Sequence, residues 1–290
     1  MIPIKKISLL FIVYGLFAML TQSSRSIDEF KYLNLLSADK SMEVDGIEGE
    51  NEILYGSGRA MLYYGEIEYG NHLIDSAALR GSAIIYQNGA STNLLLGRYR
   101  SGMSYLNSAI VNGNKYSIGY KAWLMMTNLR DYEQAIILID SLEKVDGKPT
   151  VAYAMNTTLL KGIAKRKAGR YEDALLDFDL YIIEINADNP LKIDDYVYYY
   201  KGLTYQEMGD PEKAIEEFNH FIEVYPNGPE AHYGKGNVLI EEGEIKEACK
   251  CYKIAREKIR LGYLRGFVWH EIPDQVYKSD VVEKLDLYCK

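Results

Sequence analysis

The stretch that decides the fold is "KGLTYQEMGDPEKAIEEF", which runs from Lys201 to Phe218. Nearly the same pattern begins at Lys161, as "KGIAKRKAGRYEDALLDF", and at Lys235, as "KGNVLIEEGEIKEACKCY". In each copy a Gly is followed by a second Gly seven residues later, by an Ala twelve residues later and by an aromatic residue sixteen residues later. Four offsets kept in three copies predict a repeat architecture.

Each repeat is expected to be a helix, a turn and a second helix. In the central copy we expect helices over about 195–208 and 211–224, separated by Gly209-Asp210-Pro211. Glycine readily adopts the left-handed conformation that ends a helix, and proline fits the first turn of the next helix, where its missing N–H costs nothing.

Small and large residues alternate in a way that explains the packing of each pair. Gly202 and Ala214 are the small residues that let the two helices approach closely. Phe218, Phe221 and Ile222 then share one face of the second helix. A single pair cannot bury such a face, so neighbouring pairs must stack.

At Gly202, Tyr205, Ala214, Phe218 and Pro226 the chain resembles the tetratricopeptide repeat family. The resemblance is equally good in the last copy, and it weakens at Lys165, at Asn186 and at Trp123, where Gly is expected and a wider helix pair should result. It implies an all-α, right-handed superhelical solenoid of antiparallel helix pairs, closed by a C-terminal cap. The repeats are expected at about 116–149, 155–188, 195–228 and 229–262.

The remaining segments give the domain organisation. Residues 24–115 are interpreted as an N-terminal, diverged helical region that includes one helix over 91–111, and residues 116–260 form the repeats. Residues 263–290 are expected to cap the array through apolar residues between 264 and 272 and a final helix that begins at Asp280.

The N-terminus has the composition of a secretory signal peptide. Lys5 and Lys6 precede an apolar run from Ile7 to Leu20, and Ser23 ends a plausible cleavage site. The run is shorter than the ~20 residues that a membrane-spanning helix needs. We therefore expect residues 1–23 to be removed and the protein to be exported, periplasmic or secreted. Anchoring through the uncleaved apolar segment is the alternative.

Charge and hydropathy exclude several partner classes. The 290-residue chain has a formal net charge of −8, whereas a nucleic-acid-binding protein usually presents a basic face. No segment after the N-terminus is typical of a transmembrane helix. We expect no nucleic-acid partner, and no membrane insertion once the signal peptide is cleaved.

No pattern in the chain indicates catalysis or metal binding. The four histidines, at 72, 220, 232 and 270, are not spaced as metal ligands, and no nucleophile, P-loop or dinucleotide motif is present. Cys249 and Cys251 would point to different sides of a helix. A disulfide between Cys289 and one of them would leave one thiol over. We expect no enzymatic activity, no metal and no cofactor; an active site assembled within 24–115 is the less favoured alternative.

The resemblance implies that the first helices of the repeats line a concave groove that binds extended or helical peptides. The position three residues before the conserved Gly and the position one residue after it should face that groove. These positions carry aromatic and aliphatic residues, so a ladder of apolar contacts is expected in place of a charged clamp. The predicted groove residues are Tyr120, Leu124, Leu159, Ile163, Tyr199, Leu203, Tyr233 and Asn237.

The sequence therefore favours an extracytoplasmic repeat scaffold or adaptor that binds a protein or peptide partner through its concave groove. The alternative is a structural subunit or assembly factor of an envelope complex, which should expose an apolar patch.

We predict that the mature protein starts close to Ser24. The basic residues and the short apolar run are the features that a signal peptidase substrate needs. N-terminal sequencing of the protein purified from its natural source tests this directly. A cytosolic chain that begins at Met1 would contradict the prediction.

Overall fold

The computed structural model describes residues 50–79, 83–147, 150–152, 155–188, 196–263 and 273–290. The expected signal peptide with its cleavage site at Ser23, and the apolar residues of the expected cap between 264 and 272, lie outside the described residues. The chain divides into two compact units, Met1–Ile85 and Tyr86–Lys290, which are described separately below.

The described part of the first unit is a helix pair, α3 (Glu50–Tyr63) and α4 (Ile67–Ala78). The two helices pack through glycines: a Cβ atom on Gly58 would lie 2.8 Å from the backbone oxygen of Gly70 and 2.8 Å from Ile74 Cγ1. The glycines of this region therefore do not prevent helix formation. Gly58 and Gly70 lie where the two helices pack, and their lack of a side chain lets the helices approach closely.

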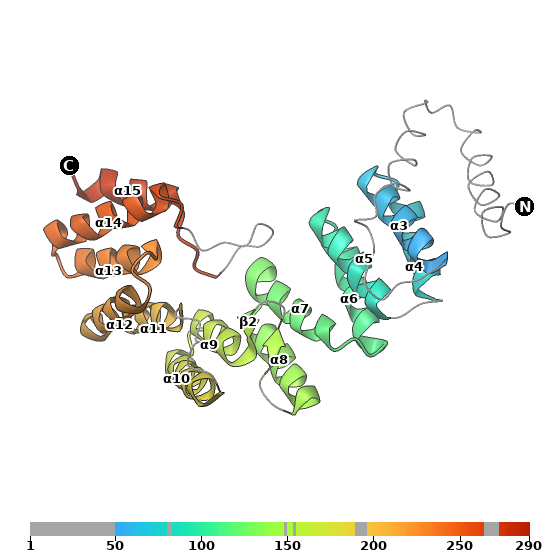
Figure 1. Ribbon diagram of the computed structural model, residues 1–290, viewed down its shortest axis with the longest axis horizontal. Coiled ribbons are helices and arrows are strands. Elements are labelled where there is room, and N and C mark those ends of the chain that lie inside the picture. The colour runs from blue at the N-terminus through green and yellow to red at the C-terminus, as the bar shows by residue number, and fades with distance from the viewer. Residues whose placement is uncertain (1–49, 80–82, 148–149, 153–154, 189–195, 264–272) are drawn as a thin grey trace, which may run out of the picture. The chain divides into compact units, whose positions relative to one another are not determined.

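The second unit continues as helix pairs along the chain (Figure 1). α5, which begins at Ala83 just before the division, is followed by helices joined by short turns, and a two-stranded antiparallel ladder pairs Val151 with Asn156 and Ala152 with Met155. The elements are α5 (Ala83–Leu95), α6 (Tyr99–Val111), α7 (Tyr116–Leu124), the π-helical turn η2 (Met125–Leu129), α8 (Tyr132–Asp146), β1 (Val151–Ala152), β2 (Met155–Asn156), α9 (Thr157–Lys167), α10 (Tyr171–Asp188), α11 (Tyr196–Met208), α12 (Pro211–Val224), α13 (Pro229–Glu241), α14 (Ile245–Arg260) and α15 (Lys278–Tyr288).

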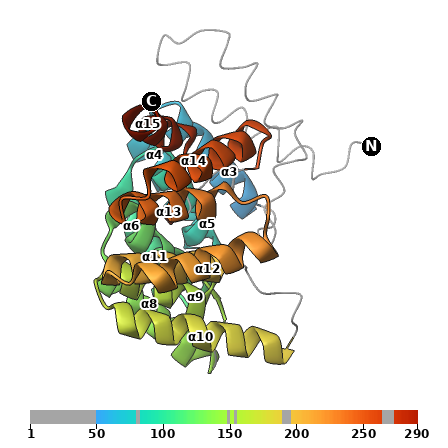
Figure 2. The same ribbon diagram turned by 90° about the vertical axis from the view of Figure 1, so that its left-hand side faces the viewer.

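Each helix from α7 to α14 contacts the next one along the chain, and α11 also contacts α9 and α13. Figure 2 shows the stack continuing from α10 through α12 to α14 and α15. The predicted all-α fold of stacked helix pairs is confirmed. The first helices of three successive repeats, α9, α11 and α13, are thus neighbours in the stack, and the surface that they share is called the inner surface below.

The conserved glycine of each repeat packs against the aromatic ring sixteen residues later. A Cβ atom on Gly162 would lie 2.5 Å from the Phe178 ring, and a Cβ atom on Gly202 would lie 2.6 Å from the Phe218 ring. The Gly236 position meets the Tyr252 ring at 2.6 Å in the same way. These distances are shorter than any real Cβ contact, so only glycine fits. Phe178, Phe218 and Tyr252 are each fully buried.

The second glycine of the pattern ends the first helix in the left-handed conformation, as the sequence predicts. Its φ is +78° at Gly169, +75° at Gly209 and +80° at Gly243. After Gly209, the Asp210 side chain accepts a hydrogen bond of 3.2 Å from the backbone N–H of Lys213, which caps α12. The turn is therefore specified by local residues alone.

The repeat spacing of seven, twelve and sixteen residues also occurs upstream of the predicted repeats, but with other residue types. The sequence analysis did not find it there. Gly58, Gly65, Gly70 and Ile74 follow the spacing of the later repeats. Ala90, Gly97, Gly102 and Leu106 follow it again, and Gly97 has a φ of +73°. A single helix over 91–111 is therefore wrong: the chain turns at Gly97, between α5 and α6.

The repeat that carries Trp123 differs from the others. Trp123 is buried, and α7 continues after it into the π-helical turn Met125–Leu129. Arg130 follows with a φ of 55°, at the position that a left-handed glycine occupies in the later repeats. The larger side chain thus coincides with a change in helix geometry, and π-helical turns are often found at functional sites.

Two other departures from the sequence pattern have a physical explanation. Lys165, which replaces a large apolar residue, forms an ion pair of 2.7 Å with the buried Asp177. Burial raises the pKa of Asp177, and Lys165 counters that effect.

The second departure concerns the final helix, which begins at Lys278. The prediction that this helix begins at Asp280 is therefore wrong. Asp280 lies within the first turn, where its carboxylate accepts a hydrogen bond of 2.8 Å from the N–H of Tyr277.

Candidate functional site

The candidate site lies on the inner surface formed by α9 and α11. Of the predicted groove residues, five are buried: Tyr120, Leu124, Leu159, Ile163 and Tyr199. Leu203, Tyr233 and Asn237 are partly buried. Leu159, Ile163 and Tyr199 belong to one hydrophobic core, which Leu203 contacts, whereas Tyr233 packs against a separate cluster that includes Tyr252. Binding by these residues stays a prediction, and most of them also hold the fold together.

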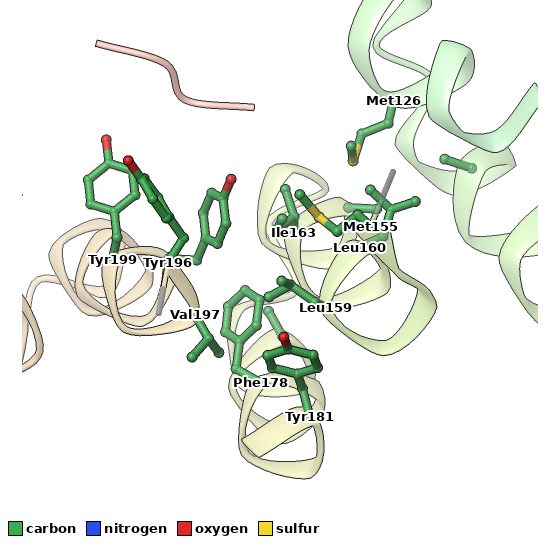
Figure 3. Packing of buried hydrophobic residues seen from close by; sticks show 14 of the residues in the cluster. Met126, Met155, Leu159, Leu160, Ile163, Phe178, Tyr181, Tyr196, Val197 and Tyr199 are labelled. Atoms are coloured by element: carbon green, nitrogen blue, oxygen red, sulfur yellow. The ribbon is translucent and has the colours of Figure 1, made fainter. Parts of the chain in front are cut away.

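Tyr196 and Tyr199 stand side by side on α11 in Figure 3, with their hydroxyl groups directed away from Val197. The Tyr199 hydroxyl donates a hydrogen bond of 3.1 Å to the backbone carbonyl of Asp274. The hydroxyl of the next residue, Tyr200, donates one of 3.2 Å to the carbonyl of Pro273. Two successive carbonyl groups of one segment are thus bound by two successive side chains of α11.

A buried arginine faces the same segment. Arg166, near the end of α9, is 1% exposed, and its guanidinium donates to the carboxylates of Glu207, at 2.5 Å, and of Asp274. Lys167 also donates to the Asp274 carboxylate. A buried guanidinium is tolerated only where carboxylates neutralise it, so Asp274 is part of what makes this position possible.

Titration of the site follows from burial and charge. Burial by itself lowers the pKa of Arg166, but the charges of Asp274 and Glu207 outweigh it and raise that pKa. Burial raises the pKa of Glu207, which Arg166 opposes. Burial and the Asp274 charge raise the pKa of Tyr199 well above its ordinary value. Arg166 therefore stays charged, and the Tyr199 hydroxyl stays a hydrogen-bond donor.

A pocket of about 220 Å³ adjoins these contacts, and the π-helical turn contributes to its wall. It is lined by Met126, Thr127, Arg130, Tyr132, Lys167, Pro273 and Asp274. A larger depression of about 430 Å³ lies elsewhere, along α12, but all of its lining residues come from that one helix. Of these two, the pocket of about 220 Å³ is the one formed by several elements that converge around charged groups.

Arg166, Lys167, Tyr200 and Asp274 were not found from the sequence. Arg166 and Lys167 stand in the run "KRK" at the end of a helix, a position where cations usually face solvent. Asp274 is 108 residues away from Arg166 along the chain, so no local pattern connects the two. The one available signal was Tyr200, which follows Tyr199 in the run "YVYYYKG".

Comparisons with known proteins agree with the fold. A tetratricopeptide repeat family model matches residues 196–228, which contain α11 and α12. A tetratricopeptide repeat protein from Parabacteroides merdae has a similar structure, with a TM-score of 0.54, 18% identity, and coverage of 83% of this chain and 84% of that one.

The chain is a tetratricopeptide repeat protein.

Two further proteins resemble this tetratricopeptide repeat protein. The type IV pilus biogenesis factor PilW has a TM-score of 0.53 and 13% identity, over 74% of this chain and 96% of its own. The photosystem I assembly protein Ycf3 from Rippkaea orientalis is 30% identical over 104 residues, which are 33% of this chain. This chain matches 58% of the length of Ycf3.

The last described helix of this repeat protein is fixed covalently. A disulfide joins Cys249 on α14 to Cys289 directly after α15, and Cys251 is a free, buried thiol. Val276, Val281 and Leu285 pack with residues of α14 in one buried cluster. The segment that contacts Arg166 is therefore followed at once by a helix that is tied to the last repeat.

The described residues include no group of three His, Cys, Asp or Glu side chains that could hold a metal ion. In the same residues, no helix is long and apolar enough to cross a membrane.

We predict that reducing the disulfide lowers the free energy of unfolding by about 2–4 kcal/mol, because a cross-link over a separation of 40 residues restricts the unfolded chain. Cys289→Ser should give the same loss without a reductant. Urea unfolding of the purified protein, with and without dithiothreitol, measures it. Cys251→Ala is the matched control and should remain sensitive to the reductant. Unfolding curves that do not respond to dithiothreitol would contradict the prediction.

Proposed function

We propose that this tetratricopeptide repeat protein is an exported scaffold that binds a polypeptide segment of a partner protein on the inner surface of α9, α11 and α13. One observation carries the proposal. Two tyrosine hydroxyls, a buried arginine and a lysine converge on the carbonyl groups and the carboxylate of a two-residue stretch of polypeptide.

The chemistry of these groups favours a polypeptide ligand over a small molecule. Hydroxyl donors that bind successive main-chain carbonyls recognise an extended chain of any sequence, and the cations add selectivity for an acidic side chain. The predicted contact at Tyr233 would extend the same surface onto α13, where Tyr233 is partly buried.

Export is supported by two independent features. The N-terminal sequence has the composition of a signal peptide. The Cys249–Cys289 disulfide is typical of proteins in an oxidising compartment.

A second function, as a structural subunit or assembly factor, is favoured by a specific surface. Leu176, Leu180 and Ile183 lie on one face of α10 and are 68%, 45% and 65% exposed. This spacing places them in a row along the helix. The names of PilW and Ycf3 describe factors for biogenesis and assembly. A partner bound to α10 would leave the inner surface free.

We predict that Tyr233→Ala weakens binding of the natural partner at least ~10-fold, since an aromatic anchor typically contributes about 2 kcal/mol. The partner would be isolated by chemical cross-linking in the native envelope fraction, and affinity would be measured by calorimetry with purified proteins. Tyr116→Ala is the control, because Tyr116 is 69% exposed on α7. Tyr199→Ala is unsuitable, since Tyr199 belongs to the core.

Thermal unfolding of each variant separates a binding effect from a loss of fold. If folded Tyr233→Ala binds normally while Leu180→Lys does not, the inner surface is excluded and the subunit function is favoured.

A further inference from the structure

The residues Pro273 to Val276, here called the strap, lead from the inner surface to α15. Their first two carbonyl groups accept hydrogen bonds from Tyr200 and Tyr199. The Asp274 carboxylate pairs with Arg166 and Lys167. At the other end, Val276 is 3% exposed within the cluster of α14 and α15. The strap therefore occupies the surface to which the proposed function assigns the partner.

The contacts of the strap are those of a bound ligand. In these four hydrogen bonds it contributes one carboxylate and two carbonyl oxygens, and the repeats contribute the donors. If the strap left, Arg166 would keep its ion pair with Glu207 but would lose the one with Asp274. Loss of one of its two carboxylates disfavours this position for the guanidinium, so a segment that supplies a replacement carboxylate favours departure of the strap.

The strap also has an uncommon backbone conformation. Asp274 has a φ of 55°, in the left-handed region that aspartate tolerates better than most residues but less well than glycine. Such a conformation persists because the surrounding contacts impose it. A competing segment that presents its carboxylate from an unstrained backbone has an advantage over the strap.

The adjacent pocket offers a place where a competitor can first bind. Arg130 is exposed at the rim, and the side chain of Lys167 is 30% exposed while it pairs with Asp274. An acidic residue can thus contact these cations before Asp274 leaves. The protein need not open fully for the exchange to begin.

We propose that the strap is an intramolecular ligand of the inner surface, and that the partner binds by displacing it and supplying an acidic side chain to Arg166 and Lys167. The inference rests on the proposed function, because it identifies the chemical class of the segment that this surface binds and the step that controls access.

The test uses the mature full-length chain and a fluorescent, N-acetylated peptide with the sequence PDQVYKS, residues 273–279. Asp274→Asn is the decisive variant, since asparagine also tolerates the left-handed conformation but removes the charge. This chain should bind the peptide at least ~10-fold more tightly than the wild-type chain does, because its own strap competes less well. A control peptide with Asn in place of Asp should bind at least ~10-fold more weakly.

Hydrogen exchange gives a second measurement that does not depend on the variant. The backbone amides of Gln275 and Val276 in the wild-type chain should exchange faster when the peptide is added in excess. Equal affinity of the two chains for the peptide, or amide exchange that excess peptide does not change, would overturn the inference.

The two proposals can fail separately. Partner binding that is lost in Tyr233→Ala but identical in wild type and Asp274→Asn overturns the strap as a competitor and leaves the proposed function standing. The reverse case is a peptide that behaves as expected and a partner that binds Tyr233→Ala normally. That outcome supports the strap as an intramolecular ligand and rejects the inner surface as the partner's site.

Discussion

The close contact between a glycine on the first helix of a repeat and an aromatic ring on the second is the constraint on which the structure depends. At Gly162, Gly202 and Gly236 the ring lies where a Cβ atom would otherwise be. The contact fixes both the distance between the two helices and their register. Because the ring is fully buried, the second helix cannot rotate to expose a different face.

This register determines what the inner surface contains. On α9 and α11, which contact each other, the glycine fixes the positions of the residues around it. Tyr199 and Tyr200 precede Gly202, and Arg166 follows Gly162 by one turn. The same geometry that packs the core therefore brings two hydroxyl donors and a guanidinium to the site where Pro273 and Asp274 lie.

The repeats between 155 and 260 were predictable because glycine, alanine and aromatic residues recur at offsets that a helix pair explains. Upstream a diverged helical region was expected, but its repeat spacing was not recognised, since Gly70 and Gly102 take the place of alanine, and Ile74 and Leu106 take the place of the ring. Helix packing requires small and large residues at these positions, not particular residue types.

The candidate site was less predictable than the fold. The sequence analysis named Tyr199 for the groove, and the structure places its hydroxyl against the strap. It could not identify Arg166 and Asp274, because the two residues are 108 positions apart in the chain and no local pattern connects them. A cation that is buried in a long-range ion pair looks the same in sequence as one that faces solvent.

A double-mutant cycle between Gly202 and Phe218 tests the central claim most directly. Gly202→Ala alone should destabilise the protein by about 1–3 kcal/mol through overpacking. Phe218→Leu opens space beside the added methyl group, so the double variant should be more stable than the sum of the two changes predicts, by at least ~0.5 kcal/mol. Urea unfolding measures all four proteins. Strictly additive losses would contradict the claim that the glycine is required by the ring.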